Sequence, residues 1–276
     1  MKLAELPKSL YHSARLLLTS GKKLQKRNDQ LPVIVSLTTI PSRLSTLPLT
    51  IKSLLLQNRQ PKKIVLWLHQ DYEGRIPGAL ERLQGEVFEI RFSEYTFSHR
   101  KLIHSLAAFP NEIIITCDDD LIYPADYIPK LYQAHLNTPE VVIGHHGRSM
   151  RPDGRGGWLP YKRWPFVNSL PDNPKLFMPV GAFCILYPPH ALDQRVQDVS
   201  LFLQLAPKSD DLWFKTMALL HGTLSIPSQA NCTDPIPIAG TQSIALKKTN
   251  IKEDLNRKQW ERLIDHFQLK SVLDLS

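Results

Sequence analysis

From residue 32 onward, short apolar segments with strand character alternate with segments whose apolar residues recur every three or four positions. The strand-like segments are 33–37, 63–69, 87–92, 112–117 and 141–144. The helix-like segments between them are 42–57, 77–84, 99–108 and 125–136. This alternation predicts βαβ units, and therefore an α/β fold with a Rossmann-like, mostly parallel sheet flanked by helices. Ligands of such sheets bind beyond the carboxyl ends of the strands.

Three consecutive carboxylates, Asp118, Asp119 and Asp120, follow the strand-like segment 112–117 in the sequence IIITCDDDLIYP. Two carboxylates about 6 Å apart repel by roughly 3 kcal/mol at an effective dielectric constant near 20, so the group needs a cation, a proton or open water. Carboxylate oxygens suit Mg²⁺ or Mn²⁺, which bind one or two of them together with substrate phosphates. A solvated turn could have the same three aspartates, but their position at the end of a strand favours a metal site.

Two further segments carry charge at the start of a predicted helix. In FSHRKLIHSL, cationic residues up to Lys101 precede an apolar helix face, which is the arrangement of an anion site or of a solvated basic helix start. In APKSDDLWFKTMALL, Asp210 and Asp211 fall in a first helical turn. Helix capping explains one aspartate there and does not require two.

The segment 147–179 between these clusters is rich in Pro, Gly, Arg and aromatic residues. A long irregular stretch of this kind is functional or disordered, and its aromatic residues Trp158, Tyr161 and Trp164 argue against disorder. We expect this segment to be functional, with its aromatic faces available to stack on sugar rings. His145, next to His146 after a strand, is a candidate third metal ligand.

SLTTIPSRL, CDDDLIYP and the later SDD together resemble the motifs of GT-A-fold glycosyltransferases, and in particular of bacterial family-2-like members, over roughly residues 32–225. In SDD, Asp210 stands where the family usually has a glutamate, so its side chain is shorter by one methylene. The resemblance implies a GT-A fold, a nucleotide-sugar donor and a divalent metal, Mn²⁺ or Mg²⁺.

The resemblance also implies roles for individual residues. Residues implied to bind the nucleotide-sugar are Thr38, Thr39, Arg43, Lys101, Asp118 and Asp119. Asp118 and Asp120 would hold the metal, with His145 as the candidate third ligand. Asp211 would be the catalytic base and Asp210 its support, although the order could be reversed. A base opposite the leaving group would give inversion of configuration.

Residues outside the α/β region form two predicted extensions. Residues 1–31 are a basic amphipathic segment, suited either to an anionic membrane surface or to packing on the domain. Residues 32–249 are the GT-A domain, divided into a nucleotide-sugar-binding half, 32–146, and an acceptor and catalytic half, 147–249. Residues 250–276 are predicted to contain a closing C-terminal helix.

These observations predict a metal-dependent, inverting glycosyltransferase that uses a nucleotide-sugar, expected to be a UDP-sugar, and a cell-surface glycan or glycolipid acceptor such as lipopolysaccharide or capsule. The expected location is cytoplasmic, at the inner face of the membrane. The alternative is a non-catalytic basic protein that binds nucleotides or other anions, which the net charge of +8 would suit. The basic residues follow no nucleic-acid-binding motif. An aspartate-nucleophile phosphatase is disfavoured by Ile122, and a sugar-nucleotide pyrophosphorylase by the lack of glycine in SLTTIPSR.

Overall fold

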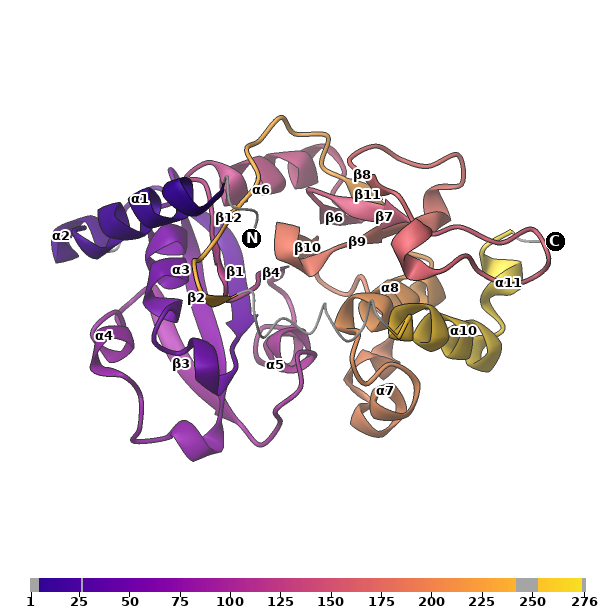
Figure 1. The fold of residues 1–276 in the computed structure, drawn as a ribbon, viewed down its shortest axis with the longest axis horizontal. Coiled ribbons are helices and arrows are strands. Elements are labelled where there is room, and N and C mark those ends of the chain that lie inside the picture. Colours follow the sequence, from indigo (N-terminus) through magenta and orange to yellow (C-terminus); the bar gives the residue numbers. More distant parts are fainter. Residues whose placement is uncertain (1–4, 26, 242–252, 275–276) are drawn as a thin grey trace.

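The computed structural model describes residues 5–25, 27–241 and 253–274. A seven-stranded sheet forms its centre, in the order β11-β6-β10-β4-β1-β2-β3 (Figure 1). In that order the strands are β11 (Ser225–Pro227), β6 (Val142–Gly144), β10 (Ile185–Tyr187), β4 (Ile113–Thr116), β1 (Gln30–Thr38), β2 (Gln60–His69) and β3 (Phe88–Ser93). Six strands share one direction, and β10 runs against its neighbours β4 and β6. The expected mostly parallel, Rossmann-like sheet is confirmed.

Helices cover both faces of this sheet. They are α3 (Leu47–Leu55), α4 (Gly78–Glu81), α5 (Arg100–Ala108), α6 (Tyr127–Asn137), α7 (Val199–Leu205) and α8 (Asp210–His221). Side chains of β1 alternate between two buried clusters: Val33 and Val35 pack with α3 and α6, whereas Ile34 packs with α5 and α8. Because both faces are buried, the strand reads as a nearly continuous apolar run, as is usual in parallel sheets.

Two smaller sheets complete the strands. One has the order β8-β7-β9 and consists of β8 (Phe166–Val167), β7 (Gly147–Ser149) and β9 (Phe177–Pro179). The other pairs β12 (Ile236–Pro237) with β5 (Leu121–Ile122), which directly follows the acidic segment. The three-stranded sheet therefore gives order to much of the segment 147–179.

The expectation that aromatic residues of this segment face a sugar is wrong. Trp158, Tyr161 and Trp164 are buried in the same cluster as Trp260, and the rings of Trp158 and Trp260 meet edge to face at 5.3 Å. Their large apolar area is worth more in the core than at the surface. These rings tie the segment to the C-terminal helix.

The predicted helix over 42–57 is shorter than expected. A 3-10 turn covers Pro41–Arg43, and α3 begins only at Leu47, with Pro48 in its first turn. A proline is tolerated at a helix start because the amide it lacks would have no helical partner there. The turn carries Arg43 toward the end of β4, so this break in the helix positions a candidate site residue.

Helices at both termini pack on the α/β core. The N-terminal segment forms α1 (Leu6–Leu17) and α2 (Gly21–Leu24), and the C-terminal segment forms α10 (Leu255–Phe267) and α11 (Leu269–Val272). They lie at opposite ends of the molecule (Figure 1). The predicted boundary at residues 249–250 falls outside the described residues. No helix within 5–25, 27–241 and 253–274 is both long and apolar enough to cross a bilayer.

We expect Trp260→Ala to lower the free energy of unfolding by about 3–5 kcal/mol, because it removes a fully buried indole from the core between α10 and α8. Urea denaturation followed by circular dichroism measures the change. Arg262→Ala, on the exposed side of the same helix, is the control and should change stability by no more than about 0.5 kcal/mol. Equal stability of the two variants would show that α10 is not part of the folded core.

Candidate active site

The position of Lys101 is set by a polar contact inside the core. The hydroxyl of Ser36, on β1, donates to the backbone carbonyl of Lys101 and lies 2.7 Å from the hydroxyl of Ser105. Both serines are fully buried, so these hydrogen bonds satisfy groups that would otherwise be costly to bury. They fix the first turn of α5 against β1 and direct the side chain of Lys101 toward the end of β4.

Lys101 joins two acidic segments that lie far apart in the sequence. Its Nζ atom is 3.1 Å from Oδ1 of Asp118 at the end of β4, and 3.0 Å from Oδ2 of Asp210 in the first turn of α8. The lysine side chain is 6% exposed, so water screens these ion pairs only weakly. The structure thus brings three of the predicted site residues to one point.

Asp211 reaches the same point from α8. Both of its carboxylate oxygens lie 3.2 Å from the backbone nitrogen of Gly181, which donates to them. A Cβ atom on Gly181 would lie 3.0 Å from Oδ1 of Asp211 and 3.3 Å from Nζ of Lys101. The lack of a side chain therefore allows this backbone to approach the charged groups closely.

The charged groups of the cluster shift one another's pKa values. Burial by itself lowers the pKa of Lys101, but the carboxylates of Asp118, Asp210 and Asp211 outweigh this effect and raise that pKa well above its ordinary value. Burial raises the pKa of Asp210, but the positive charge of Lys101 outweighs it, and the net shift is downward. Lys101 and Asp210 therefore form a persistent ion pair.

Asp211 shows the opposite behaviour. Burial and the neighbouring negative charge of Asp210 raise its pKa to about 8, and the opposing effects of Lys101 and of the Gly181 amide do not cancel them. One lysine cannot neutralise three nearby carboxylates, so the last of them holds a proton near neutrality. A carboxyl group whose pKa is close to the working pH is suited to accept a proton from a reacting hydroxyl.

Asp119 and Asp120 face away from this cluster toward the loop after β1. Arg43 contacts both, with 2.5 Å from Nη1 to Oδ1 of Asp119 and 3.0 Å from Nη2 to Oδ2 of Asp120. The hydroxyl of Thr39 also donates to Asp119. Burial raises the pKa of Asp119, although Arg43 and Thr39 oppose this. Thr39 and Arg43 are thus brought to the acidic segment, and their role in donor binding stays a prediction.

The other two residues of the sequence HRK, His99 and Arg100, have structural roles. Arg100 is buried, donates 2.7 Å to the carbonyl of Thr39, and also bonds the hydroxyl of Thr38. Thr38 in turn donates 2.9 Å to the carbonyl of Trp67 on β2. His99 stacks on Phe202 with ring centroids 4.3 Å apart, and burial lowers its pKa to about 4. Of the three residues in the sequence HRK, only the lysine forms ion pairs with the carboxylate cluster.

His145 is not brought to the acidic segment, which corrects its expected place beside Asp118 and Asp120. Its ring nitrogens bond the hydroxyl of Ser228 at 2.8 Å and the carbonyl of Tyr127 at 2.9 Å. The cause is strand β10, which lies between β6 and β4 and separates their ends by two strand spacings, about 10 Å. In the part of the chain that the structure describes, no group of three or more His, Cys, Asp and Glu side chains is arranged to hold a metal.

Sequence reasoning missed two residues that contribute to the site. Gly181 was hidden in a long irregular segment, and only its place in PVGAF, after an apolar run, could have drawn attention to it. Ser36 is a polar residue inside the apolar run VIVSL, which is a usable signal.

The sequence model of the family described as glycosyl transferase family 2 matches residues 40–188, more than half of the chain. This chain belongs to glycosyl transferase family 2. Membership supports a glycosyltransferase-like function with a nucleotide-sugar and an acceptor. The matched region includes Arg43, Lys101 and the acidic segment, whereas Asp210 and Asp211 lie beyond it.

Two solved structures are similar to this family-2 chain. One is 4-diphosphocytidyl-2C-methyl-D-erythritol synthase from Anaerococcus prevotii, at 13% identity and a TM-score of 0.48, covering 86% of this chain and 100% of the other. The second is CMP:2-keto-3-deoxy-manno-octonic acid synthetase complexed with CTP, at 14% identity and a TM-score of 0.44, covering 82% of this chain and 99% of the other. No curated protein matches the chain.

We expect Asp211→Asn to stabilise the metal-free protein more at pH 8 than at pH 5, by at least about 1 kcal/mol. Because its pKa rises from 3.8 to about 8 on folding, Asp211 keeps a proton that the unfolded chain releases, so its contribution to stability is lost as pH rises through this range. Urea denaturation at both pH values, in the presence of EDTA, measures the difference between variant and wild type.

Glu89→Gln is the comparison, because Glu89 lies outside this cluster and its pKa is lowered on folding: burial raises it, but Lys63 and Arg91 outweigh this effect. Its contribution to stability is therefore essentially complete at pH 5. This variant should be destabilised to the same extent at pH 5 and pH 8. If Asp211→Asn behaved in the same pH-independent way, the carboxyl group of Asp211 would not hold a proton near neutrality.

Proposed function

We propose that this chain is a metal-dependent, inverting glycosyltransferase that moves a sugar from a UDP-sugar to a hydroxyl of a cell-surface glycan such as lipopolysaccharide or capsule. The observation that carries this proposal is the cluster of Lys101, Asp118, Asp210 and Asp211 at the carboxyl end of β4, in a chain of this family. Ligands of parallel α/β sheets bind at such strand ends.

Asp211 is the proposed general base. Attack on the anomeric carbon requires that the acceptor hydroxyl lose its proton, and a carboxylate with a raised pKa accepts that proton readily. The amide of Gly181 holds the carboxylate in one orientation. Asp210 then serves as a positioning residue, since its ion pair with Lys101 fixes the first turn of α8. A base on the face opposite the departing diphosphate gives the inverted anomer.

Lys101 has two proposed roles. In the protein alone its charge makes the approach of three carboxylates tolerable. When a donor binds at the end of β4, a buried ammonium group beside Asp118 would also attract the donor's phosphates. A shift of Lys101 from carboxylate to phosphate would free Asp118 for another ligand.

Asp118 is the best-placed residue for a divalent metal. Its side chain is 35% exposed and, among the described residues, its carboxylate forms an ion pair with Lys101 alone, whereas Asp120 is held by Arg43. Mg²⁺ and Mn²⁺ need only one or two protein carboxylates when substrate phosphates supply further oxygens, so Asp118 fits this chemistry. Asp120 would join it once its ion pair with Arg43 is broken. A metal bound there would supply charge neutralisation to the departing diphosphate.

The proposed setting is the cytoplasmic face of a membrane, with residues 1–30 in contact with anionic lipid. Four apolar residues of this segment are exposed: Leu10, Tyr11, Leu17 and Leu18. Only Leu16 of its apolar run LLL is buried. An exposed apolar stripe on a basic helix is typical of helices that lie in the membrane interface. A membrane-bound glycolipid acceptor would be presented at that surface.

We expect the protein to bind UDP in the presence of Mn²⁺ and Asp118→Asn to weaken that binding at least about tenfold, since it removes a charged metal ligand. Isothermal titration calorimetry with and without Mn²⁺ measures both effects. Asp126→Asn, which changes a partly exposed aspartate that forms an ion pair with Lys130, is the control and should bind UDP normally. Equal binding without metal, or in Asp118→Asn, would favour a non-catalytic anion-binding protein.

We expect Asp211→Asn to reduce kcat about 10²- to 10⁴-fold while UDP binding persists, because only proton removal is lost. The assay is UDP release from UDP-sugars in the presence of a glycan extract. Asp210→Asn should act mainly through the position of α8, with a smaller loss of kcat and a loss of stability. If Asp210→Asn alone abolished turnover in a folded protein, the two aspartates would exchange roles.

A further inference from the structure

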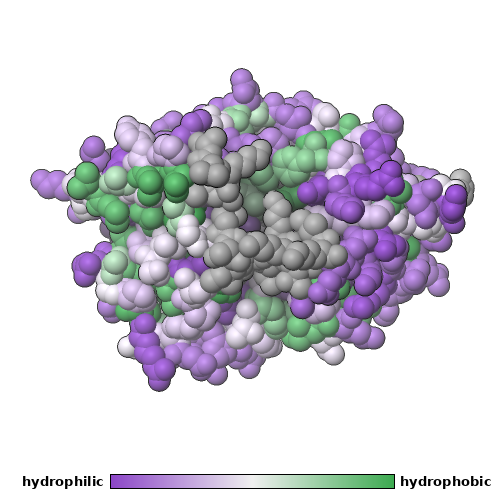
Figure 2. Space-filling view, in the orientation of Figure 1, coloured by the Kyte–Doolittle hydropathy of each residue, from purple (hydrophilic) through white to green (hydrophobic). Residues whose placement is uncertain are grey.

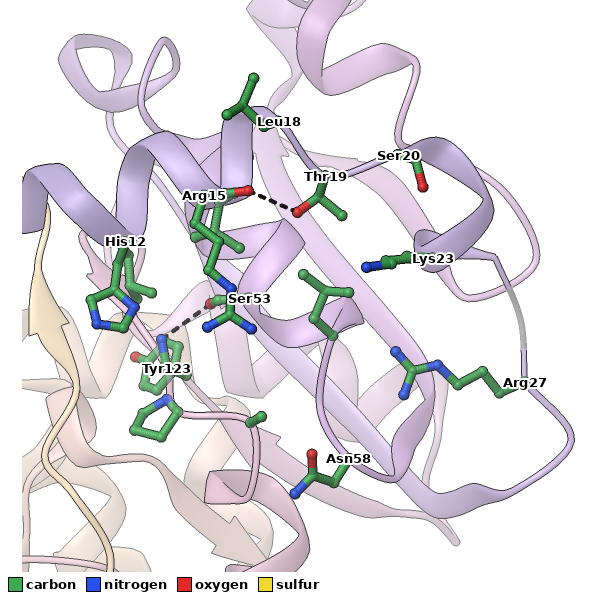
Figure 3. Close-up of a pocket in the computed structure, with 15 residues that line it drawn as sticks. His12, Arg15, Leu18, Thr19, Ser20, Lys23, Arg27, Ser53, Asn58 and Tyr123 are labelled. Carbon is green, nitrogen blue, oxygen red and sulfur yellow. Dashed lines mark hydrogen bonds between the residues drawn. The ribbon is translucent and has the colours of Figure 1, made fainter.

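A cavity lies away from the carboxylate cluster, between the N-terminal helices and the core. Its volume is about 600 Å³, within the usual range for small-molecule sites. Residues of α1, α2 and the following segment form one wall, and α3 with residues 122–125 forms the other (Figure 3). Its lining includes the exposed residues Arg15, Leu18 and Lys23, so it opens to solvent.

Positive charge gathers in this cavity without a counter-charge. Arg15, Lys23 and Arg27 direct their charged ends into it, and His12 stands at its side (Figure 3). No aspartate or glutamate of the described residues lines it. Within the same part of the chain, no carboxylate forms an ion pair with any of the three cations. Cations that converge without a partner repel one another, and a bound anion relieves that repulsion.

Arg27 shows that the site is partly ordered in advance. Its Nη1 atom donates 2.8 Å to the carbonyl of Gln57, and its backbone amide donates 3.1 Å to the side chain of Gln60. The guanidinium is therefore held at the wall by one nitrogen, and its other donors remain available. Such a fork binds phosphate oxygens with defined geometry.

The cavity is separate from the candidate active site but shares a residue with it. Tyr123 lines the cavity, and its amide donates 3.1 Å to the hydroxyl of Ser53, another lining residue. The phenol of Tyr123 points the other way and bonds the backbone amide of Asp118 at 2.9 Å. Tyr123 therefore connects a wall of the cavity to the backbone of Asp118.

Apolar side chains surround the entrance on the α1 side. Leu17 and Leu18 are 66% and 87% exposed, and Leu18 also lines the cavity. Figure 2 shows hydrophobic residues gathered on the visible face at the end of the molecule that α1 occupies. A cationic recess bordered by exposed leucines is complementary to a phosphate group carried at an apolar surface.

We propose that this cavity binds a phosphate group through Arg15, Lys23 and Arg27, with the headgroup of an anionic phospholipid as the favoured source and a soluble phosphate as the other. Phosphate binding here does not depend on the proposed sugar transfer. Only a lipid source rests on the proposed membrane association.

The first test titrates inorganic pyrophosphate into the full chain in the presence of EDTA, which prevents metal-dependent binding at Asp118. The double variant Arg15→Gln with Lys23→Gln should lose at least about tenfold in affinity, because two charge-assisted contacts are removed. The matched control, Lys8→Gln with Lys22→Gln, removes the same charge from exposed positions of the same helices outside the cavity. It should bind pyrophosphate as the wild type does.

The second test identifies the source by flotation with phosphatidylcholine vesicles, with and without phosphatidylglycerol. With a lipid source, vesicle binding requires phosphatidylglycerol and is lost in the cavity variant. It is also lost in Leu10→Gln with Leu17→Gln, which changes exposed residues outside the cavity and keeps pyrophosphate binding. Pyrophosphate binding without vesicle binding assigns a soluble phosphate. The proposal would be overturned if the cavity variant and the Lys8 and Lys22 control lost the same affinity for pyrophosphate. It would also be overturned if the wild type bound neither pyrophosphate nor vesicles.

If the cavity variant still bound UDP with Mn²⁺ normally, its loss of pyrophosphate binding would be a local effect on the cavity and not a general loss of folding. A failure of UDP binding in the wild type would instead count against the proposed transferase and leave the pyrophosphate result unaffected.

Discussion

The ammonium group of Lys101 is the contact on which the candidate site depends. It links the end of β4 to the start of α8 through Asp118 and Asp210, and it is buried among more negative charge than it can neutralise. Together with burial, the excess of negative charge raises the pKa of Asp211. The same imbalance is the basis of the proposal that a divalent cation and a diphosphate bind here. The raised pKa of Asp211 and the proposed metal binding would then have one cause, the excess of carboxylates over ammonium groups.

Such a cluster costs stability, and the fold supplies the support. Three carboxylates near one lysine can persist only on rigid elements. Ser36 and Ser105 hold α5 on β1, and Tyr123 closes the turn after β4 by bonding the backbone of Asp118 at both its amide and its carbonyl. These residues touch no expected substrate atom. They keep the charged groups at short distances that electrostatic repulsion would otherwise increase.

Features that depend on local periodicity could be predicted from the sequence. The parallel strands around β4 were recognisable because a strand buried on both faces has a continuous apolar sequence. The acidic segments could be identified directly from their consecutive aspartates. The place of His145 could not be predicted, because it depends on the insertion of β10, a three-residue strand without a periodic signal. The contact of Gly181 with Asp211 was equally inaccessible, since it joins positions 30 residues apart through tertiary structure.

Strand β10 also determines the order in which this chain can fold during synthesis. Strand β4 pairs with β1 on one side and with β10 on the other, so one of its edges stays open until Tyr187 has been made. The second edge of strand β6 stays open for longer, because its partner β11 is complete only when Pro227 has been made. An unpaired edge in the middle of a sheet is a template for wrong pairing with other chains. A nascent chain that has completed its acidic segment therefore still needs nearly seventy further residues before the strand beneath that segment is protected.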